Sequence, residues 1–136
     1  MTREEKELLL VDLSGRLSYG VKVQYECWNE ETEEYNDVID VLYSINVSKW
    51  INVLKLDEEV YIEGIKPYLF PLSSMTEEQK EEYCSLQQKV IYNSKGLINS
   101  DVMEYVNWCY KNHIDINNLI PMGLANDATG LEIYGK

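Results

Sequence analysis

The sequence predicts an α+β fold, because the hydrophobic period is mostly that of strands in the first half of the chain and that of helices in the second half. Up to residue 72 apolar residues mostly recur at every second position, the period of a strand with one buried face. From residue 73 they recur every three or four positions, the period of an amphipathic helix. We therefore expect a single domain, 1–136, that is mainly β over 1–72 and mainly α over 73–136. The length of 136 residues suits one core.

A short helix is expected to open the chain. Four leucines share one helical face at spacings of three and four residues: Leu9, Leu10, Leu13 and Leu17. Ser14-Gly15 is expected to end this helix, since glycine is common just past a helix end.

Four strands are expected to follow. The first puts alternate residues on one buried face: Val21, Val23, Tyr25 and Cys27. A polar acidic connection, 29–37, leads to a longer strand whose buried face is expected to carry Ile39, Val41, Tyr43, Ile45 and Val47. The third runs from Trp50 to Leu56, and the fourth starts at Val60 and extends as far as Tyr68.

Short polar turns separate these strands, at Ser48-Lys49 and at 57–59. Strands joined in this way predict an antiparallel meander or a small SH3-like barrel. Pro67 and Pro71 are expected to stop the sheet pairing, because proline has no N–H to donate.

Two helices are expected in the second half. Thr76 and Gln79 form a capping-box pattern, which opens a helix to about Tyr92 with three inward residues: Tyr83, Leu86 and Val90. Ser100-Asp101 starts the next helix, whose apolar stripe is Val102, Val106 and Cys109, flanked by Tyr105 and Trp108. Beyond His113 we expect an irregular segment anchored by Ile114, Leu119, Ile120 and Leu124, then a last strand containing Leu131, Ile133 and Tyr134.

Charge excludes two classes of partner. Lys and Arg number 12 against 24 Asp and Glu, so the net charge is −12. Nucleic-acid binders present a basic face, and anionic membranes attract basic segments, so we expect neither as a direct partner. No run approaches the ~18 apolar residues of a membrane span. Three scattered cysteines, Cys27, Cys84 and Cys109, make no disulfide framework, so we expect a cytoplasmic protein.

No specific catalytic or cofactor motif is present, and we expect no cofactor and no metal. Cys109 and His113 have the spacing of half a zinc site, but only Cys84 could add another soft ligand. The structural alternative is a buried thiol beside a histidine that caps a helix end.

The largest charge anomaly is a run of seven acids without a base: Glu26, Glu30, Glu31, Glu33, Glu34, Asp37 and Asp40. The run contains no glycine, which a calcium loop needs. It is typical of a solvated turn that keeps a strand edge soluble. The sharper interpretation is a surface that imitates phosphate charge and occupies a basic groove on another protein.

Aromatic residues are unevenly distributed, with 11 Tyr and 3 Trp against 1 Phe. Tyr and Trp suit half-buried core positions as well as interfaces. Trp28 is out of phase with the buried face of its strand, so it projects to the opposite face beside the acidic run. The hypothetical protein-binding residues are therefore Trp28, Glu30, Glu31, Glu33, Glu34 and Tyr35.

Three blocks resemble a family of small uncharacterised proteins from gut anaerobic bacteria and their phages. They are 12–21 (DLSGRLSYGV), 65–79 (IKPYLFPLSSMTEEQ) and 113–125, which is similar to a His-x-Asp-x-x-x-Leu-Ile-x-x-Gly-Leu-Ala ending. The resemblance implies a bacterial or phage cytoplasmic setting and a compact domain, and it brings no catalytic residue. Ile114 and Asn117-Asn118 depart from the family's usual aromatic and Arg-Gly pair.

Three functions are weighed. The first is a non-enzymatic accessory module that binds another protein. The second is a phosphate-mimicking inhibitor of a nucleic-acid-binding protein, for which the acids at Asp57, Glu58, Glu59 and Glu63 would have to join the acidic run. The third is an enzyme that uses His113 and Asp115, with Asn117 nearby.

Overall fold

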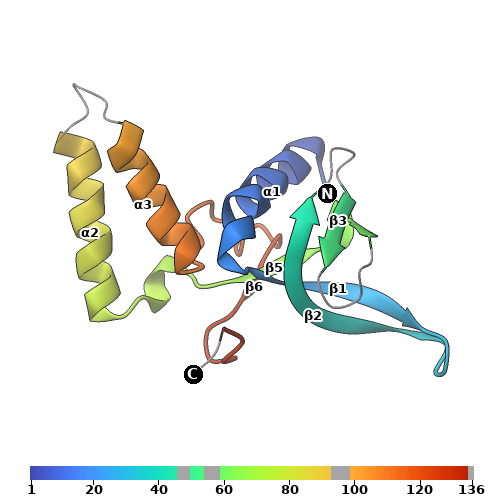
Figure 1. Ribbon diagram of the computed structural model, residues 1–136. Coiled ribbons are helices and arrows are strands. Elements are labelled where there is room, and N and C mark those ends of the chain that lie inside the picture. The colour runs from blue at the N-terminus through green and yellow to red at the C-terminus, as the bar shows by residue number, and fades with distance from the viewer. Residues whose placement is uncertain (46–49, 54–58, 93–98, 135–136) are drawn as a thin grey trace.

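The computed structural model describes residues 1–45, 50–53, 59–92 and 99–134, and it confirms the α+β class (Figure 1). Its helices are α1 (Arg3–Arg16), α2 (Glu77–Tyr92) and α3 (Asn99–Lys111). Its strands are β1 (Lys22–Asn29), β2 (Glu34–Ile45), β3 (Trp50–Val53), β4 (Glu59–Tyr61), β5 (Lys66–Leu69) and β6 (Asn126–Asp127). Short 3-10 turns occupy Leu17–Tyr19, Ile62–Gly64 and Leu72–Ser74. The predicted turn at Ser48-Lys49 and the end of the third predicted strand lie outside the described residues.

The strands form an open mixed sheet in the order β4-β3-β2-β1-β5-β6. The first four strands make the expected antiparallel meander, but β5 returns to pair with β1, and β6 runs parallel to β5. The described strands therefore do not close into a barrel. Pro67 was wrongly expected to stop pairing: it lies opposite Val23, near the start of β5, where a missing N–H is tolerated.

Over residues 38–43 the buried face of β2 is the reverse of the expected one. Beyond a register shift between Leu42 and Ser44, Ile45 packs against the core as expected, and Val47 lies outside the described residues. Val38 and Asp40 lie opposite the buried residues Tyr25 and Val23, and residues directly opposite in an antiparallel pair share a face. Asp40 and Leu42 are accordingly buried, whereas Ile39 and Tyr43 are exposed. The more apolar side of β2 faces outward because the register with β1, and not the strand's own alternation, decides the face.

The sequence predicted that helix α1 ends at Ser14-Gly15, and this prediction is wrong. The helix continues to Arg16 and a 3-10 turn, and Gly20 ends that turn with a left-handed φ of 69°. Gly15 is needed for close packing instead: a Cβ there would lie 2.2 Å from Cε2 of Tyr110. The core beneath α1 joins Leu9 and Leu13 to β1, β5 and the C-terminal segment.

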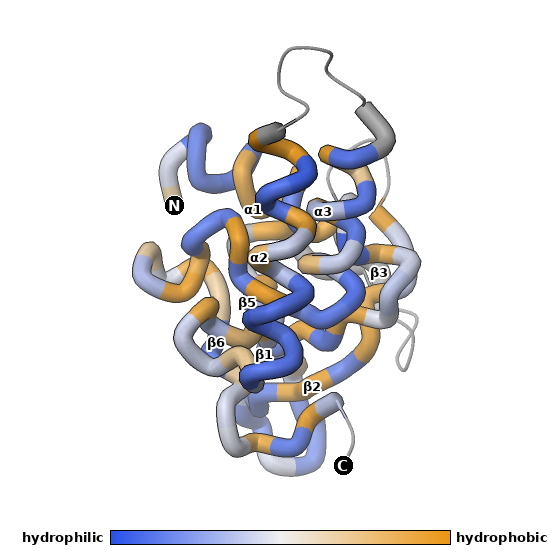
Figure 2. Tube along the Cα trace, turned by 90° about the vertical axis from the view of Figure 1, so that its left-hand side faces the viewer, coloured by the Kyte–Doolittle hydropathy of each residue, from blue (hydrophilic) through white to orange (hydrophobic). Residues whose placement is uncertain are grey.

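Helices α2 and α3 form a hairpin set to one side of the sheet (Figure 1). The capping box is confirmed, since Thr76 Oγ1 accepts the Gln79 N–H and the Gln79 side chain accepts the Thr76 N–H. Figure 2 views the molecule from the side of α2, whose first turns are mostly hydrophilic. In the described part of the chain no helix is both long and apolar enough to cross a bilayer.

The segment after α3 is irregular, as expected, and its predicted anchors Ile114, Leu119 and Leu124 are buried. The predicted last strand at 131–134 is wrong, because these residues form bends and turns and Leu131 is exposed. Tyr134 instead bonds to the sheet: its hydroxyl accepts the Lys22 N–H at 2.9 Å and donates to the Tyr68 carbonyl at 2.6 Å.

Candidate functional site

The candidate site lies on the long hairpin of β1 and β2, which curves away from the rest of the molecule (Figure 1). The acidic connection is shorter than predicted, because Glu34 already pairs with Asn29. The Asn29 side chain accepts the N–H groups of Glu31 and Thr32, and Glu33 has a φ of 55°. This tight turn leaves four of the predicted site residues exposed at the tip: Glu30, Glu31, Glu33 and Glu34.

Trp28 and Tyr35 form an aromatic pair next to the tip. They are directly opposite in the register, and their ring centroids lie 5.0 Å apart in an edge-to-face arrangement. Trp28 is 49% exposed and Tyr35 is 66% exposed. Trp28 therefore projects to the side away from Val23 and Tyr25, as its phase predicted. The pair joins the two aromatic members of the predicted site on one surface.

The same side of the hairpin continues with more exposed residues, and we call Trp28, Tyr35, Ile39, Glu26 and Asp37 the outer face. Ile39 follows Tyr35 on β2 and is 44% exposed, and Tyr43 further along the strand is 58% exposed. Single exposed apolar residues are ordinary, but several of them gathered on one side of a hairpin among polar groups are typical of an interaction surface.

Between the aromatic pair and Ile39, the outer face carries two acids directly opposite each other, Glu26 and Asp37. Like charges in this position destabilise a strand pair. They line a hollow of about 620 Å³ whose far wall includes Lys66 and Asn126. Burial, and secondly the charge of Asp37, raise the pKa of the Tyr68 hydroxyl.

Hydrogen bonds fix the far wall of this hollow. Asn126 donates to the Gln24 side chain at 2.6 Å, and the Tyr68 hydroxyl donates to the same oxygen at 3.4 Å. Sequence reasoning missed Lys66 and Asn126, because β5 and β6 come from distant parts of the chain to lie beside β1. It placed Ile39 on the buried face, because the register of β2 with β1 cannot be seen in the alternation of β2 alone. The carboxylates of Glu26 and Asp37 and the side chains of Gln24 and Asn126 give the hollow groups that can bind a cationic or hydrogen-bonding ligand.

Glu59, one member of the second acidic group, lies far from the tip in the described backbone. Glu59 pairs with Asn52, which pairs with Ser44 at the far end of β2 from Glu34. Along the strand this is a span of about 30 Å. Asp57 and Glu58 lie outside the described residues. The single phosphate-like patch thus has no support from the described register, and the phosphate-mimic hypothesis stays a prediction.

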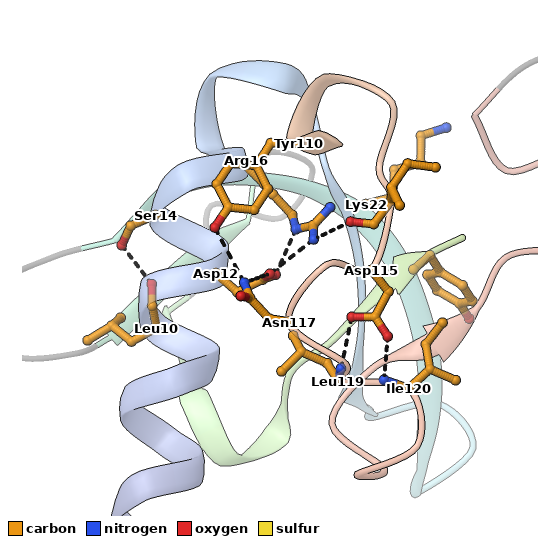
Figure 3. Close-up of polar contacts among 12 residues, drawn as sticks. Leu10, Asp12, Ser14, Arg16, Lys22, Tyr110, Asp115, Asn117, Leu119 and Ile120 are labelled. Atoms are coloured by element: carbon orange, nitrogen blue, oxygen red, sulfur yellow. Dashed lines mark hydrogen bonds and ion pairs between the residues drawn. The ribbon is translucent and has the colours of Figure 1, made fainter. Parts of the chain in front are cut away.

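The residues of the enzyme hypothesis are engaged in structural contacts (Figure 3). The Asp115 carboxylate accepts the Leu119 N–H at 2.8 Å and the Ile120 N–H at 2.9 Å. Asn117 donates to the Asp12 carboxylate at 2.8 Å. Asp115 therefore stabilises the turn at Leu119 and Ile120, and Asn117 bonds to α1. These contacts do not direct the two side chains into a shared cleft.

His113 has a similar structural setting. Its ring stacks on Tyr134 with centroids 3.7 Å apart, and its backbone has a φ of 59°. Burial, with the positive charges of Arg16 and Lys22 nearby, lowers the pKa of His113 to about 4. His113 is therefore neutral at pH 7, and it does not provide the positive charge that would stabilise the C-terminal end of α3.

Cys109 is completely buried, and burial raises the pKa of its thiol to about 11. A thiol with such a pKa is a poor nucleophile at neutral pH. Within the described residues, no group of three or more His, Cys, Asp or Glu side chains is placed to hold a metal ion.

No protein-family model, curated protein or solved structure matches the chain. The resemblance of its three sequence blocks therefore stays a prediction.

Proposed function

We propose that the protein is a non-enzymatic accessory module that binds another protein through the outer face and the acidic tip of the β1–β2 hairpin. The observation that carries the proposal is the reversed β2 strand, which leaves Tyr35 and Ile39 exposed beside Trp28. Tyr and Trp are enriched at interfaces because a large rigid ring loses little entropy when it is covered.

Charge favours a basic partner. The tip and the outer face contribute six carboxylates: Glu26, Glu30, Glu31, Glu33, Glu34 and Asp37. A second copy of this chain, with its net charge of −12, would bring like charges together, whereas a basic surface would neutralise them. Binding to a basic surface would also relieve the repulsion between Glu26 and Asp37. The bacterial or phage origin in this proposal rests on the sequence resemblance alone.

The test is affinity capture with paired baits. The first bait carries Trp28→Thr, Tyr35→Thr and Ile39→Thr, which keep residues that favour strands. The control bait carries Val11→Gln, Met122→Gln and Leu131→Gln at positions that are 64%, 43% and 54% exposed. A partner retained by the wild type and the control, but lost by the outer-face variant, supports the proposal. Equal capture by all three baits contradicts it.

The role of the acids is tested with the purified partner. Glu30→Gln, Glu31→Gln, Glu33→Gln and Glu34→Gln together should leave unfolding unchanged, because exposed charges contribute little to stability. The same variant should slow association and weaken its salt dependence, since electrostatic steering acts on the on-rate. An unchanged association rate rejects the basic partner.

A further inference from the structure

The α2–α3 hairpin carries a second surface, independent of the proposed function. A groove of about 400 Å³ lies between the two helices, lined by Glu81, Glu82, Ser85, Leu86, Glu104 and Trp108. On α2 the groove is lined by two neighbouring rows of side chains, Glu81 with Ser85 and Glu82 with Leu86, and the residues within each row are four apart. On α3 it is lined by one such row, Glu104 with Trp108. Such a pair of ridges has the shape that receives a third helix.

Trp108 is held in a fixed orientation on the groove wall. Its indole Nε1–H donates to the Glu82 carboxylate at 2.7 Å, and Tyr83 packs beside the ring with centroids 6.2 Å apart. Leu86, which is largely buried, is the other apolar residue that lines the groove. The floor of the groove is therefore apolar and rigid, while its rim carries carboxylates.

The rim carries an excess of negative charge. Lys89 lies 3.6 Å from Glu104, so that carboxylate is partly balanced. Lys80 lies 3.4 Å from Glu77 instead, and Glu82 is bonded to an uncharged indole. Among the described residues no cation therefore pairs with Glu81 or Glu82, and both line the groove with Trp108, whose indole N–H bonds to Glu82. Tryptophan is the aromatic residue whose ring face attracts cations most strongly.

We propose that this groove binds a basic amphipathic helix of another protein, with an Arg or Lys side chain against Trp108 and between Glu81 and Glu82. The apolar side chains on one face of the bound helix pack on the floor of the groove, and its Lys or Arg side chains lie against the acidic rim. This is the helix-in-groove mode of recognition. A second copy fits poorly, because the first turns of α2 carry Glu77, Glu78, Glu81 and Glu82. Figure 1 shows the hairpin of β1 and β2 on the other side of the molecule, so the two surfaces are separate.

The test titrates the full chain with a synthetic 15-residue peptide of Leu and Arg at helical spacing. A control peptide carries Glu in place of Arg. The ¹H–¹⁵N signal of the Trp108 indole, assigned by triple-resonance spectra, should shift with the Arg peptide, and that of Trp28 should stay in place. Absence of any shift at millimolar peptide, a shift of the Trp28 signal in place of Trp108, or equal binding of the Glu peptide overturns the proposal.

A matched pair of variants separates the groove from general attraction. Glu81→Gln with Glu82→Gln should weaken peptide binding by about fivefold at low salt, the size of one exposed cation–π or charge contact. Glu30→Gln with Glu31→Gln makes the same charge change at the hairpin tip and should weaken it by less than about twofold. Equal losses in the two variants overturn the proposal. Sedimentation of the chain without peptide tests whether a second copy occupies the groove. If the wild type is a dimer and the variant Glu81→Gln with Glu82→Gln is a monomer, the proposal is also overturned.

Discussion

Arg16 and Asp12, one turn apart on α1, form a completely buried ion pair with hydrogen bonds of 2.7 and 3.0 Å. Arg16 also donates to the Ile114 carbonyl at 2.7 Å, and its guanidinium lies 4.7 Å from the centre of the Tyr110 ring (Figure 3). The pair thereby fixes α1 to α3 and to the segment that follows it. A charged cluster inside the core is stable only while both charges are present.

Removing one charge should be more damaging than removing both. Asp12→Asn should lower the free energy of unfolding by about 3–5 kcal/mol, because it leaves Arg16 charged and buried without a counter-ion. Asp12→Leu with Arg16→Met should cost less than the single change, as measured by urea unfolding. The control is Arg3→Met, which breaks the exposed pair with Glu7 and should cost less than about 0.5 kcal/mol. A double variant less stable than Asp12→Asn contradicts this prediction.

Gly15→Ala should destabilise the protein, although alanine is the better helix former. The new methyl would meet Tyr110, and overpacking of a filled core costs about 1–3 kcal/mol, against a gain in helix propensity of about 1 kcal/mol. Ser14→Ala, on the exposed neighbouring position, provides the control and should leave stability within about 0.5 kcal/mol. Thermal unfolding measures both variants. A melting temperature of Gly15→Ala above that of the wild type would show that Tyr110 moves aside freely.

His113 should make stability fall as the pH drops from about 6.5 to about 4. The pKa of His113 is lowered to about 4 in the folded chain from an ordinary value of 6.5, so in this window the unfolded chain binds the extra proton. The contribution is complete above pH 6.5, and its slope is at most about 1.4 kcal/mol per pH unit.

His113→Asn removes the titration and keeps a residue type that tolerates the left-handed backbone. Urea unfolding across pH 4–7 should show a shallower dependence for the variant, whatever its stability at pH 7. Parallel curves for the two proteins would mean that His113 is as accessible to protons in the folded chain as in the unfolded one.

Thr76→Ala should lower stability by about 1 kcal/mol, because it deprives the Gln79 N–H of its acceptor at the start of α2. Thr32→Ala changes an exposed threonine in the hairpin turn and should have little effect. Circular dichroism at 222 nm during thermal unfolding compares the two variants. If both lose the same stability, the capping box is not what anchors α2.

Signals that depend on neighbours within one turn were predictable from the sequence. The Thr76–Gln79 capping box, the helix it opens and the exposed orientation of Trp28 follow from local spacing alone, because caps and side-chain periods are set by residues close in the chain. The change of hydrophobic period likewise determined the α+β class, the opening helix and the antiparallel meander.

Only the tertiary structure decided which residues meet. Both sides of β2 contain apolar residues, so its own sequence allows either face to be buried, and pairing with β1 selects Asp40 and Leu42. The sequence pattern around Gly15 predicts a helix end. The structure shows instead that Gly15 leaves room for the ring of Tyr110, a residue far along the chain. The hollow beside Glu26 exists because β5 and β6 return to the sheet. Register and long-range packing depend on pairs of distant segments, and the alternation within one segment carries no information about its partner.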